Sequence, residues 1–208
     1  MEKTITDIET QKNNPNRLNI YLDDVFGFGV SRFVGAWLQT GNKLSESEIE
    51  QLVTRDAREK AFQKALHYIG YHPRSEYEVR KKLIDQGFSD ELTMDVVSEL
   101  CEKNYINDRQ FAEDWIVTRS QSKPRSQRMF TYELRKKQIE DAIIMRALEQ
   151  APLDEELALR LGKKYIRRYA HLEDAVFEKK MKGVLARKAF PFSVINKAII
   201  QLIKMRNT

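Results

Sequence analysis

Hydrophobic residues in this chain recur with a period of 51 residues. When residues 83–100 are aligned with 134–151 and 185–202, six columns are apolar in all three copies; they begin at Leu83, Phe88, Leu92, Val96, Val97 and Leu100. The chain is 41% hydrophobic, and chance would give only about one such column in this window. A period of about 50 residues is typical of a repeat architecture, in which each unit packs mainly against its neighbours.

The apolar spacing within each repeat predicts three helices. All four prolines after Pro15 fall where a helix should begin or a connection should lie. Ser75 followed by Glu78 forms an S-x-x-E capping box, and Gly87 is placed to end that helix. The predicted helices are 54–70, 75–86, 89–103, 107–122, 126–137, 139–150, 153–170, 173–188 and 191–205.

The third repeat diverges from the other two. Pro73-Arg74-Ser75 recurs as Pro124-Arg125-Ser126, but the aligned triplet in the third repeat is Ala175-Val176-Phe177. The first helix of this repeat is offset by about one residue, and divergence is expected of a terminal unit that caps an array. Gly162 and Gly183 lie inside predicted helices, where we expect them to permit close helix packing.

The N-terminal segment has a different pattern. Residues 1–16 are polar and are predicted to be a disordered tail. Alternating apolar residues over 18–22, the turn residues Asp23-Asp24 and the apolar run 25–28 predict a β-hairpin. Apolar residues over 33–38 have helical spacing and predict a covering helix that ends at Gly41-Asn42.

We therefore predict a mainly all-α fold of three tandem three-helix repeats in an elongated curved array, preceded by a short β-hairpin and helix. The predicted boundaries are 1–16 for the tail, 17–53 for the hairpin and helix, and 54–104, 105–151 and 152–208 for the repeats. A capped linear array has no obvious self-complementary patch, so a monomer is expected.

Charge is unevenly distributed along the chain. Residues 1–60 hold 8 Lys/Arg and 10 Asp/Glu, whereas residues 61–208 hold 28 and 21. The basic repeats favour an acidic or polyanionic partner, although such a balance is also common in proteins that bind nothing acidic. Cys101 is the only cysteine, no apolar run reaches the length of about 20 residues that a membrane span needs, and the N-terminus lacks a signal-peptide core. These features predict a cytoplasmic protein without membrane contact.

The sequence gives no indication of catalysis or of a cofactor. His67, His72 and His171 are not spaced as metal ligands, and Cys101 has no C-x-x-C partner. No phosphate-binding loop is present, because the Gly27-Phe28-Gly29 stretch lies in the predicted hairpin. We expect a non-enzyme in which Cys101 is a buried, inert thiol.

Basic clusters are the candidate functional surface. Between Arg119 and Lys137 there are seven Lys/Arg and one acid, and a second cluster at 163–168 contains two i, i+4 pairs. Basic helix faces contact phosphates, but they can also be simple solvated faces. The candidate partner-contact residues are Arg74, Arg125, Arg128, Arg135, Lys136, Lys163, Lys164, Arg167 and Arg168. Nearby aromatic residues either stack on bases or, as their helical spacing favours, pack in the core; they are Phe111, Trp115, Tyr132, Tyr165 and Tyr169.

Several motifs together resemble the RecX family of bacterial regulatory proteins. They are Ala65-Leu66-x-Tyr68, Pro73-Arg74-Ser75-x-x-Glu78-x-Arg80-x-Lys82-Leu83, Gly87-Phe88 and Ile106-Asn107-Asp108-x-x-Phe111-Ala112. The segment from Arg17 to Phe28 is similar to a hairpin that precedes the repeats in some members. The resemblance implies tandem three-helix units that bind the RecA recombinase in the groove of its DNA filament, suppress its ATPase and strand exchange, and so limit recombination and the SOS response.

Two other functions stay open at this point. Three-helix units approximate helix-turn-helix geometry, so a stand-alone DNA-binding protein is the main alternative. A plain helical scaffold for another protein is the third possibility, and it predicts little response to nucleic acid or RecA.

Overall fold

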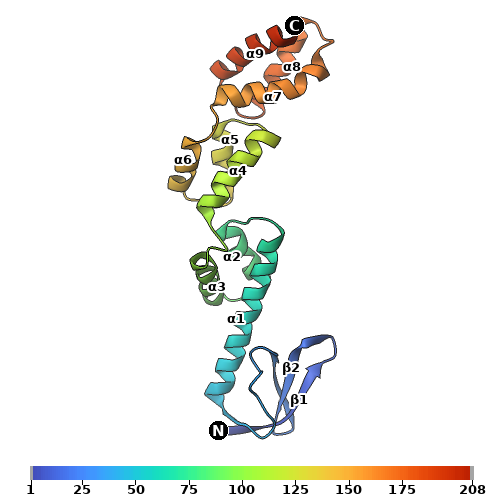
Figure 1. Cartoon of the computed structure of the whole chain (residues 1–208), viewed down its shortest axis with the longest axis vertical. Helices are drawn as coiled ribbons and strands as arrows, with labels where there is room; N and C mark the ends of the chain where they lie inside the picture. The colour runs from blue at the N-terminus through green and yellow to red at the C-terminus, as the bar shows by residue number, and fades with distance from the viewer. Residues whose placement is uncertain (1, 207–208) are drawn as a thin grey trace. The chain divides into compact units, whose positions relative to one another are not determined.

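The computed structural model describes residues 2–206, which form four strands followed by nine helices (Figure 1). Two compact units can be distinguished. The N-terminal unit runs to Tyr71 and includes Arg80–Leu100, and the C-terminal unit contains His72–Val79 and the described residues from Cys101 onward.

The N-terminal unit contains an antiparallel sheet with strand order β3-β2-β1-β4. Its strands are β1 (Glu2–Gln11), β2 (Asn14–Leu22), β3 (Val25–Ser31) and β4 (Lys43–Ser45). The prediction of a disordered tail is therefore wrong for residues 2–16. Ile5 lies opposite Leu22 in the register and is fully buried, so this polar-looking segment is held by ladder hydrogen bonds and by apolar side chains spaced along one strand.

The predicted hairpin is confirmed as the β2–β3 pair. Asp23 and Asp24 form its two-residue loop, and both have positive φ, 49° and 68°, as a type I′ turn requires. Ile20 and Leu22 of β2, with Phe28 and Val30 of β3, are buried. The alternation along the strands thus places one face of the hairpin in the core.

The helix predicted over 33–38 is not formed, and turns occupy this segment. The backbone N–H of Val34 donates to Ser31 Oγ at 3.2 Å, the N–H of Gly35 donates to the Ser31 carbonyl at 2.9 Å, and the N–H of Leu38 donates to the Gly35 carbonyl at 3.0 Å, so the chain makes successive turns and no regular helix. Val34 and Leu38 are buried against the sheet, as the pattern required, but Phe33 and Trp37 are exposed.

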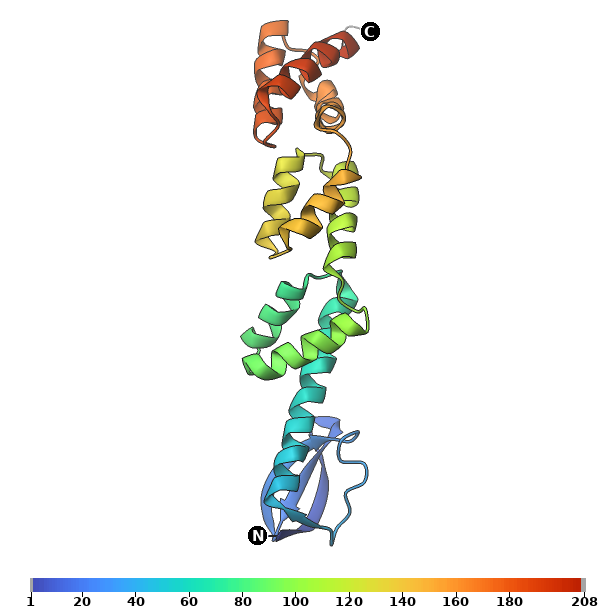
Figure 2. The same ribbon diagram turned by 90° about the vertical axis from the view of Figure 1, so that its left-hand side faces the viewer.

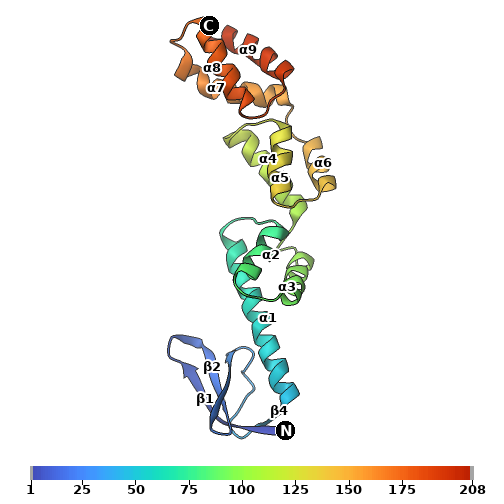
Figure 3. The same ribbon diagram turned by 180° about the vertical axis from the view of Figure 1, so that it is seen from behind.

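The helix that covers the sheet is α1 (Glu46–Tyr71), which begins eight residues before the predicted start at Thr54. Ser45 and Glu48 form a capping box: the Ser45 N–H donates to Glu48 Oε2 at 2.7 Å and the Glu48 N–H donates to Ser45 Oγ at 3.3 Å. The first half of α1 lies beside the sheet (Figures 1 and 2), and β4 leads directly into it (Figure 3).

The remaining helices follow the predicted order of the repeats. They are α2 (Glu76–Asp85), α3 (Asp90–Glu102), α4 (Asp108–Ser122), α5 (Gln127–Lys136), α6 (Asp141–Glu149), α7 (Asp154–Tyr169), α8 (Asp174–Ala186) and α9 (Phe192–Arg206). Every residue in the six apolar columns is buried or half-buried, which confirms that the 51-residue pattern marks core positions.

The turn after the middle helix repeats with the same period. Gly87, Gln138 and Ala189 are each 51 residues apart and adopt left-handed backbone with φ of 87°, 58° and 59°. After each of the first two, the next N–H returns to a carbonyl of the helix, as from Ile139 to Leu134 at 3.2 Å. Only the first repeat has the glycine that this conformation favours, so the turn is set by its hydrogen bonds and not by the residue type alone.

The sequence suggested that the first helix of the third repeat is offset by about one residue, and this prediction is wrong, because the start of that helix comes five residues earlier than the 51-residue period requires. The first-turn residue Asp108 of α4 corresponds to Asp154 of α7, 46 positions later. Each accepts a hydrogen bond from the first backbone N–H of the middle helix in the preceding repeat, from Glu76 and from Gln127.

When the helices are aligned at their starts, the fully buried Phe130 of α5 corresponds to Phe177 of α8, 47 positions later, because their N–H groups bond the carbonyls of the cap residues Ser126 and Glu173. Leu185 lies eight residues after Phe177, whereas Leu134 lies four residues after Phe130, so about one extra turn of α8 restores the 51-residue spacing at Leu185.

Consecutive repeats in the C-terminal unit meet through the start of the middle helix. Ser75 Oγ donates to the carbonyl of Lys137 at 3.0 Å, and the Ser126 N–H donates to the carbonyl of Lys188 at 3.2 Å. These carbonyls are 51 residues apart, and each immediately precedes a left-handed residue. The junction therefore reuses one backbone feature of the neighbouring repeat.

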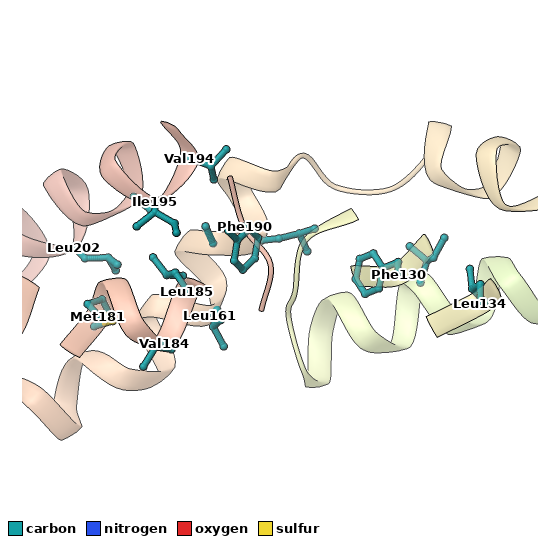
Figure 4. Packing of buried hydrophobic residues seen from close by; sticks show 14 of the residues in the cluster. Phe130, Leu134, Leu161, Met181, Val184, Leu185, Phe190, Val194, Ile195 and Leu202 are labelled. Atoms are coloured by element: carbon teal, nitrogen blue, oxygen red, sulfur yellow. The ribbon is translucent and has the colours of Figure 1, made fainter. Parts of the chain in front are cut away.

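A continuous apolar core fills the C-terminal unit, with Leu161, Met181, Leu185, Ile195 and Leu202 gathered at its third repeat (Figure 4). A Cβ atom added at Gly162 would lie 2.3 Å from Leu202 Cδ1, so Gly162 permits close packing as predicted. The same explanation is wrong for Gly183, since a Cβ there would meet only Arg187 Nη1, at 3.4 Å.

Candidate partner-binding surface

The predicted basic residues in the C-terminal unit divide into those that hold the fold and those that face solvent. Arg125 belongs to the first group, because it is only 8% exposed. Its Nη1 bonds Glu133 Oε1, and its Nε donates to the Lys123 carbonyl at 3.0 Å. Burial, with a smaller effect from the charge of Arg119, lowers the pKa of Arg125. Arg125 is thus placed inside the repeat and not on a surface open to a partner.

A network of charges and aromatic rings surrounds this arginine. Trp115 Nε1 donates to the second oxygen of Glu133 at 3.0 Å. The Lys137 ammonium bonds Glu78 at 2.6 Å and lies 4.7 Å from the centre of the Trp115 ring, while the Arg119 guanidinium lies 4.2 Å from the same ring. Phe111 stacks on Trp115 at 5.7 Å between centroids. Phe111 and Trp115 therefore pack within the protein and are covered by its own cations.

The exposed face of α5 carries the other predicted residues of this repeat. Arg128, Tyr132, Arg135 and Lys136 follow i, i+4, i+7 and i+8 spacing and are all exposed. Arg135 makes a two-point ion pair with Asp141, with Nε–Oδ1 at 2.7 Å and Nη2–Oδ2 at 3.0 Å.

The α5 side chains differ in how much charge they leave available. Hydrogen bonds from Arg135 hold the pKa of Asp141 below its ordinary value, so part of the Arg135 charge is already matched. The Lys136 ammonium lies 4.7 Å above the exposed Tyr132 ring. Arg128 has no ion-pair partner within residues 2–206. The face thus begins with the unmatched cation of Arg128, and the Tyr132–Lys136 cation–aromatic pair lies one to two turns further along α5.

The basic stripe of α7 lies on the same unit. Lys163, Lys164, Arg167 and Arg168 are all exposed. Lys164 has a structural contact, since its ammonium bonds the carbonyls of Gln121 and Ser122 at 2.9 and 2.8 Å and so caps the C-terminal end of α4. In the part of the chain that the structure describes, Lys163 and Arg167 have no ion-pair partner.

The remaining candidates are less available to a partner. Arg74 is half-buried in the loop before α2. Tyr165 and Tyr169 are half-buried and stack on each other at 6.1 Å, and the Arg168 guanidinium lies 5.8 Å from the Tyr169 ring. Of the five aromatic residues considered, only Tyr132 presents more than half of its side chain to solvent.

Cys101 is a half-buried thiol whose Sγ lies 4.0 Å from Glu76 Oε2. Burial, together with the charges of Glu76, Asp108 and Glu102, raises the pKa of Cys101 to about 11. Because the thiolate is the reactive form, this environment suppresses nucleophilic chemistry near neutral pH. Over residues 2–206, no group of three or more His, Cys, Asp and Glu side chains is arranged to hold a metal ion.

Sequence reasoning missed a set of residues in the N-terminal unit. Asp56 is 6% exposed and accepts from the Ser31 N–H at 2.6 Å and from Arg17 Nη2 at 2.8 Å, which fixes α1 to the end of the sheet. Beside this contact, one face of α1 carries Lys60 and Lys64 at i, i+4 spacing. That spacing was visible in the sequence, but its position next to the sheet was not.

Comparison with known proteins identifies the family. Four family models match in order along the chain: the regulatory protein RecX N-terminal domain at residues 3–45, and the first, second and third RecX three-helix domains at 61–100, 107–148 and 154–199. The chain belongs to the RecX family of regulatory proteins. Regulatory protein RecX of Bacillus pumilus is 34% identical over 94% of this chain and 76% of its own length, and that of Bacillus velezensis is 33% identical over 95% and 76%.

A solved structure supports the same assignment. A crystal structure of regulatory protein RecX aligns with a TM-score of 0.69 and 30% identity over 93% of this chain and 97% of that one. The fold is thus that of RecX, mainly helical with three three-helix domains after an N-terminal strand segment. Within residues 2–206, none of the helices of this RecX chain is long and apolar enough to cross a membrane.

Proposed function

We propose that this RecX-family chain binds the RecA recombinase on its DNA filament and modulates, in the expected direction of inhibition, its ATPase and strand-exchange activities. Through RecA it would regulate DNA repair, homologous recombination and the SOS response. The observation that carries the proposal is the pair of exposed basic faces, on α5 and α7, in a chain that belongs to a family of regulatory proteins.

The mechanism rests on binding and not on chemistry. Arg128, Lys163 and Arg167 would face RecA carboxylates or filament phosphates, where their charges attract at long range and are screened by salt. A protein that binds one filament state more tightly shifts the population toward it, by no more than its differential affinity. Binding to bare DNA through phosphates alone would be weaker, since such contacts carry no sequence information.

We further propose that the protein acts as a monomer in the cytoplasm. Its single cysteine needs no oxidising compartment, and the raised pKa of that thiol disfavours a disulfide between two copies. Light scattering across a concentration series tests this part of the proposal, and a mass that doubles at working concentration would contradict it.

The functional test is the single-strand-dependent ATPase of RecA during titration of this protein, with a DNA-only binding control. The informative variant is Lys163→Gln/Arg167→Gln/Arg168→Gln, which leaves Lys164 on its α4 carbonyls. The control is Lys179→Gln/Lys180→Gln, which removes two exposed charges from α8 of the same unit. The triple variant should need several-fold more protein to suppress the ATPase, and its effect should depend less on salt.

The alternatives give different outcomes. Suppression by wild type well below one protein per RecA, with weak binding to bare DNA, supports the filament regulator. Tight binding to DNA without any effect on RecA would instead favour the stand-alone DNA-binding protein, and no response to either would favour a scaffold. Equal behaviour of the triple variant and its control, with the fold intact, would remove the α7 stripe from the proposal.

A further inference from the structure

The N-terminal unit contains an open groove with a volume of about 930 Å³. One wall is formed by the end of the sheet and the turn that follows β3, and the other by the exposed face of α1, with Lys82 of α2 contributing to the lining. The groove is separate from the basic faces of α5 and α7, since its lining residues all belong to the N-terminal unit.

The base of the groove is fixed by the buried ion pair between Arg17 and Asp56. Asp56 accepts hydrogen bonds from Arg17 and from the Ser31 N–H, and Arg17 Nη2 also donates to the Gly29 carbonyl at 2.9 Å. These two charges are matched and desolvated, so they hold the sheet against α1 and are not free for a ligand. The groove is therefore a preformed feature of the unit.

The rim of the groove is basic. Arg32, Lys60, Lys64 and Lys82 are exposed lining residues, whereas Glu59 is the only acid of the lining besides the paired Asp56. Lys60 and Lys64 begin a row on α1 that continues through His67 to Tyr71 at i, i+4, i+7 and i+11 spacing, which spans about 16 Å of one helix face. A polyanion lying along α1 would meet this row lengthwise.

Two large aromatic rings that are mostly exposed open onto the same groove. Phe33 is 72% exposed and Tyr71 is 65% exposed. The Tyr71 ring contacts His67 edge-on at 4.8 Å, and its hydroxyl lies 3.1 Å from His67 Nε2, which holds the ring beside the basic row. Exposed aromatic faces next to cations are the arrangement that binds unpaired bases by stacking while the cations contact phosphates.

We propose that this groove binds single-stranded nucleic acid, with phosphates against Arg32, Lys60, Lys64 and Lys82 and with bases stacked on both Phe33 and Tyr71. An acidic protein segment would satisfy the cations but would leave the aromatic faces unused. A duplex would bury its base faces and could not stack on them. The proposal goes beyond RecA modulation, because this contact is made by the protein alone.

The test uses the full chain without RecA and follows the fluorescence anisotropy of a labelled oligothymidylate. Phe33→Ala should weaken binding between about 5-fold and 100-fold, the effect expected of losing one stacked base. Its matched control is Trp37→Ala, which removes another exposed aromatic ring of the same unit that does not line the groove. Both side chains are exposed, so the variants should fold normally.

A second pair of variants tests the phosphate contacts. Lys60→Gln/Lys64→Gln should reduce the slope of log affinity against log salt by about 1.4, the value for two lost contacts to a single strand. Lys12→Gln/Lys43→Gln, which removes two exposed lysines outside the groove, should leave the slope unchanged.

Three outcomes would overturn the inference: equal effects of the groove variants and their controls, undiminished binding by Phe33→Ala, or competition by polyglutamate as effective as by oligothymidylate, which would indicate an acidic protein ligand. If the Phe33→Ala variant loses oligothymidylate binding but still suppresses the RecA ATPase, the groove proposal is supported and the proposed function stays intact. The two proposals can therefore fail separately.

Discussion

The hydroxyl of Ser75 donates a 3.0 Å hydrogen bond to the backbone carbonyl of Lys137, so the residue that caps α2 also fastens the next repeat. One period later the same junction is made differently, by the backbone N–H of Ser126 to the carbonyl of Lys188. The serine hydroxyl thus has two roles in the first junction and only a capping role in the second, where Ser126 Oγ accepts from the Met129 N–H at 3.2 Å.

Ser75→Ala should therefore be more destabilising than Ser126→Ala. Loss of a helix cap costs about 1 kcal/mol, and loss of the Lys137 bond adds about 1 kcal/mol. We expect about 2 kcal/mol for Ser75→Ala and about 1 kcal/mol for Ser126→Ala in urea unfolding followed by circular dichroism. Equal losses would show that the Ser75–Lys137 bond contributes nothing.

The two helical glycines of the third repeat should respond oppositely to alanine. Gly162→Ala places a Cβ 2.3 Å from Leu202 Cδ1, and Leu202 is fully buried, so overpacking should cost about 1–3 kcal/mol. Gly183→Ala meets open space except for the end of Arg187 and should stabilise by about 0.5–1 kcal/mol through helix propensity. Thermal unfolding of both variants checks the pair.

A double-mutant cycle identifies the cause of the Gly162 effect. In a Leu202→Ala background the space above Gly162 is open, so the added methyl group should be tolerated better than in wild type. An equal cost in both backgrounds would exclude the Leu202 contact as the reason.

Arg125 and Arg128 lie three residues apart but should behave as different kinds of residue. Their burial is the cause: the Arg125 side chain is 10% exposed and paired with Glu133, whereas Arg128 is exposed. Arg125→Ala leaves the half-buried Glu133 without its ion-pair partner and with only the Trp115 hydrogen bond, so it should cost about 3 kcal/mol, while Arg128→Ala should change stability by less than about 0.5 kcal/mol.

The two arginines should also differ in their effect on binding to the RecA filament. Arg128→Ala should lower affinity for the RecA filament at low salt while the unfolding midpoint stays at the wild-type value. If Arg125→Ala has the same unfolding midpoint as the wild type, the ion pair between Arg125 and Glu133 does not stabilise the repeat.

Cys101 should be unreactive near neutral pH because its pKa is raised to about 11. At pH 8 the thiolate fraction is then roughly 200-fold lower than for an ordinary thiol, so alkylation by iodoacetamide should be slower by about that factor. The folded state keeps its proton to higher pH than the unfolded chain, so stability should fall as pH rises above about 8.5.

The pH profile of alkylation checks this directly. The rate in the folded protein should rise with an inflection near the raised pKa of Cys101, and Glu76→Gln should move the inflection to lower pH by removing a nearby negative charge. Glu149→Gln, on the exposed side of α6, serves as the control. An inflection at the ordinary thiol value in wild type would show that Cys101 is open to water.

The repeats were predictable because their signal is local. Columns such as Leu83, Leu134 and Leu185 report burial through spacing that a helix imposes within a few residues. The strand containing Ile5 was not predictable in the same way, since it depends on pairing with Leu22, far away in sequence. The role of Arg125 was missed for a related reason: a charge count does not reveal that Glu133 and Trp115 surround it.

The constant 51-residue alignment also hid a real difference. Leu185 and the left-handed Ala189 keep the period, but Phe177 matches Phe130 at a spacing of 47. An alignment that matches the C-terminal ends of α5 and α8 therefore misaligns their N-terminal ends. The groove of the N-terminal unit was missed because it combines residues from the sheet, α1 and α2, which only the fold brings together.

The extra turn of α8 implies a rule for how such a chain can change length. Met181 and Leu185 lie one above the other on the buried face, four residues apart, so a whole turn adds one more core layer without rotating the end of the helix. An insertion of one or two residues would instead turn that end by about 100° or 200° and carry the Lys188 carbonyl away from Ser126. Insertions and deletions that the middle helix tolerates should thus come in steps of a full turn, because only these keep both the buried face and the junction with the neighbouring repeat in register.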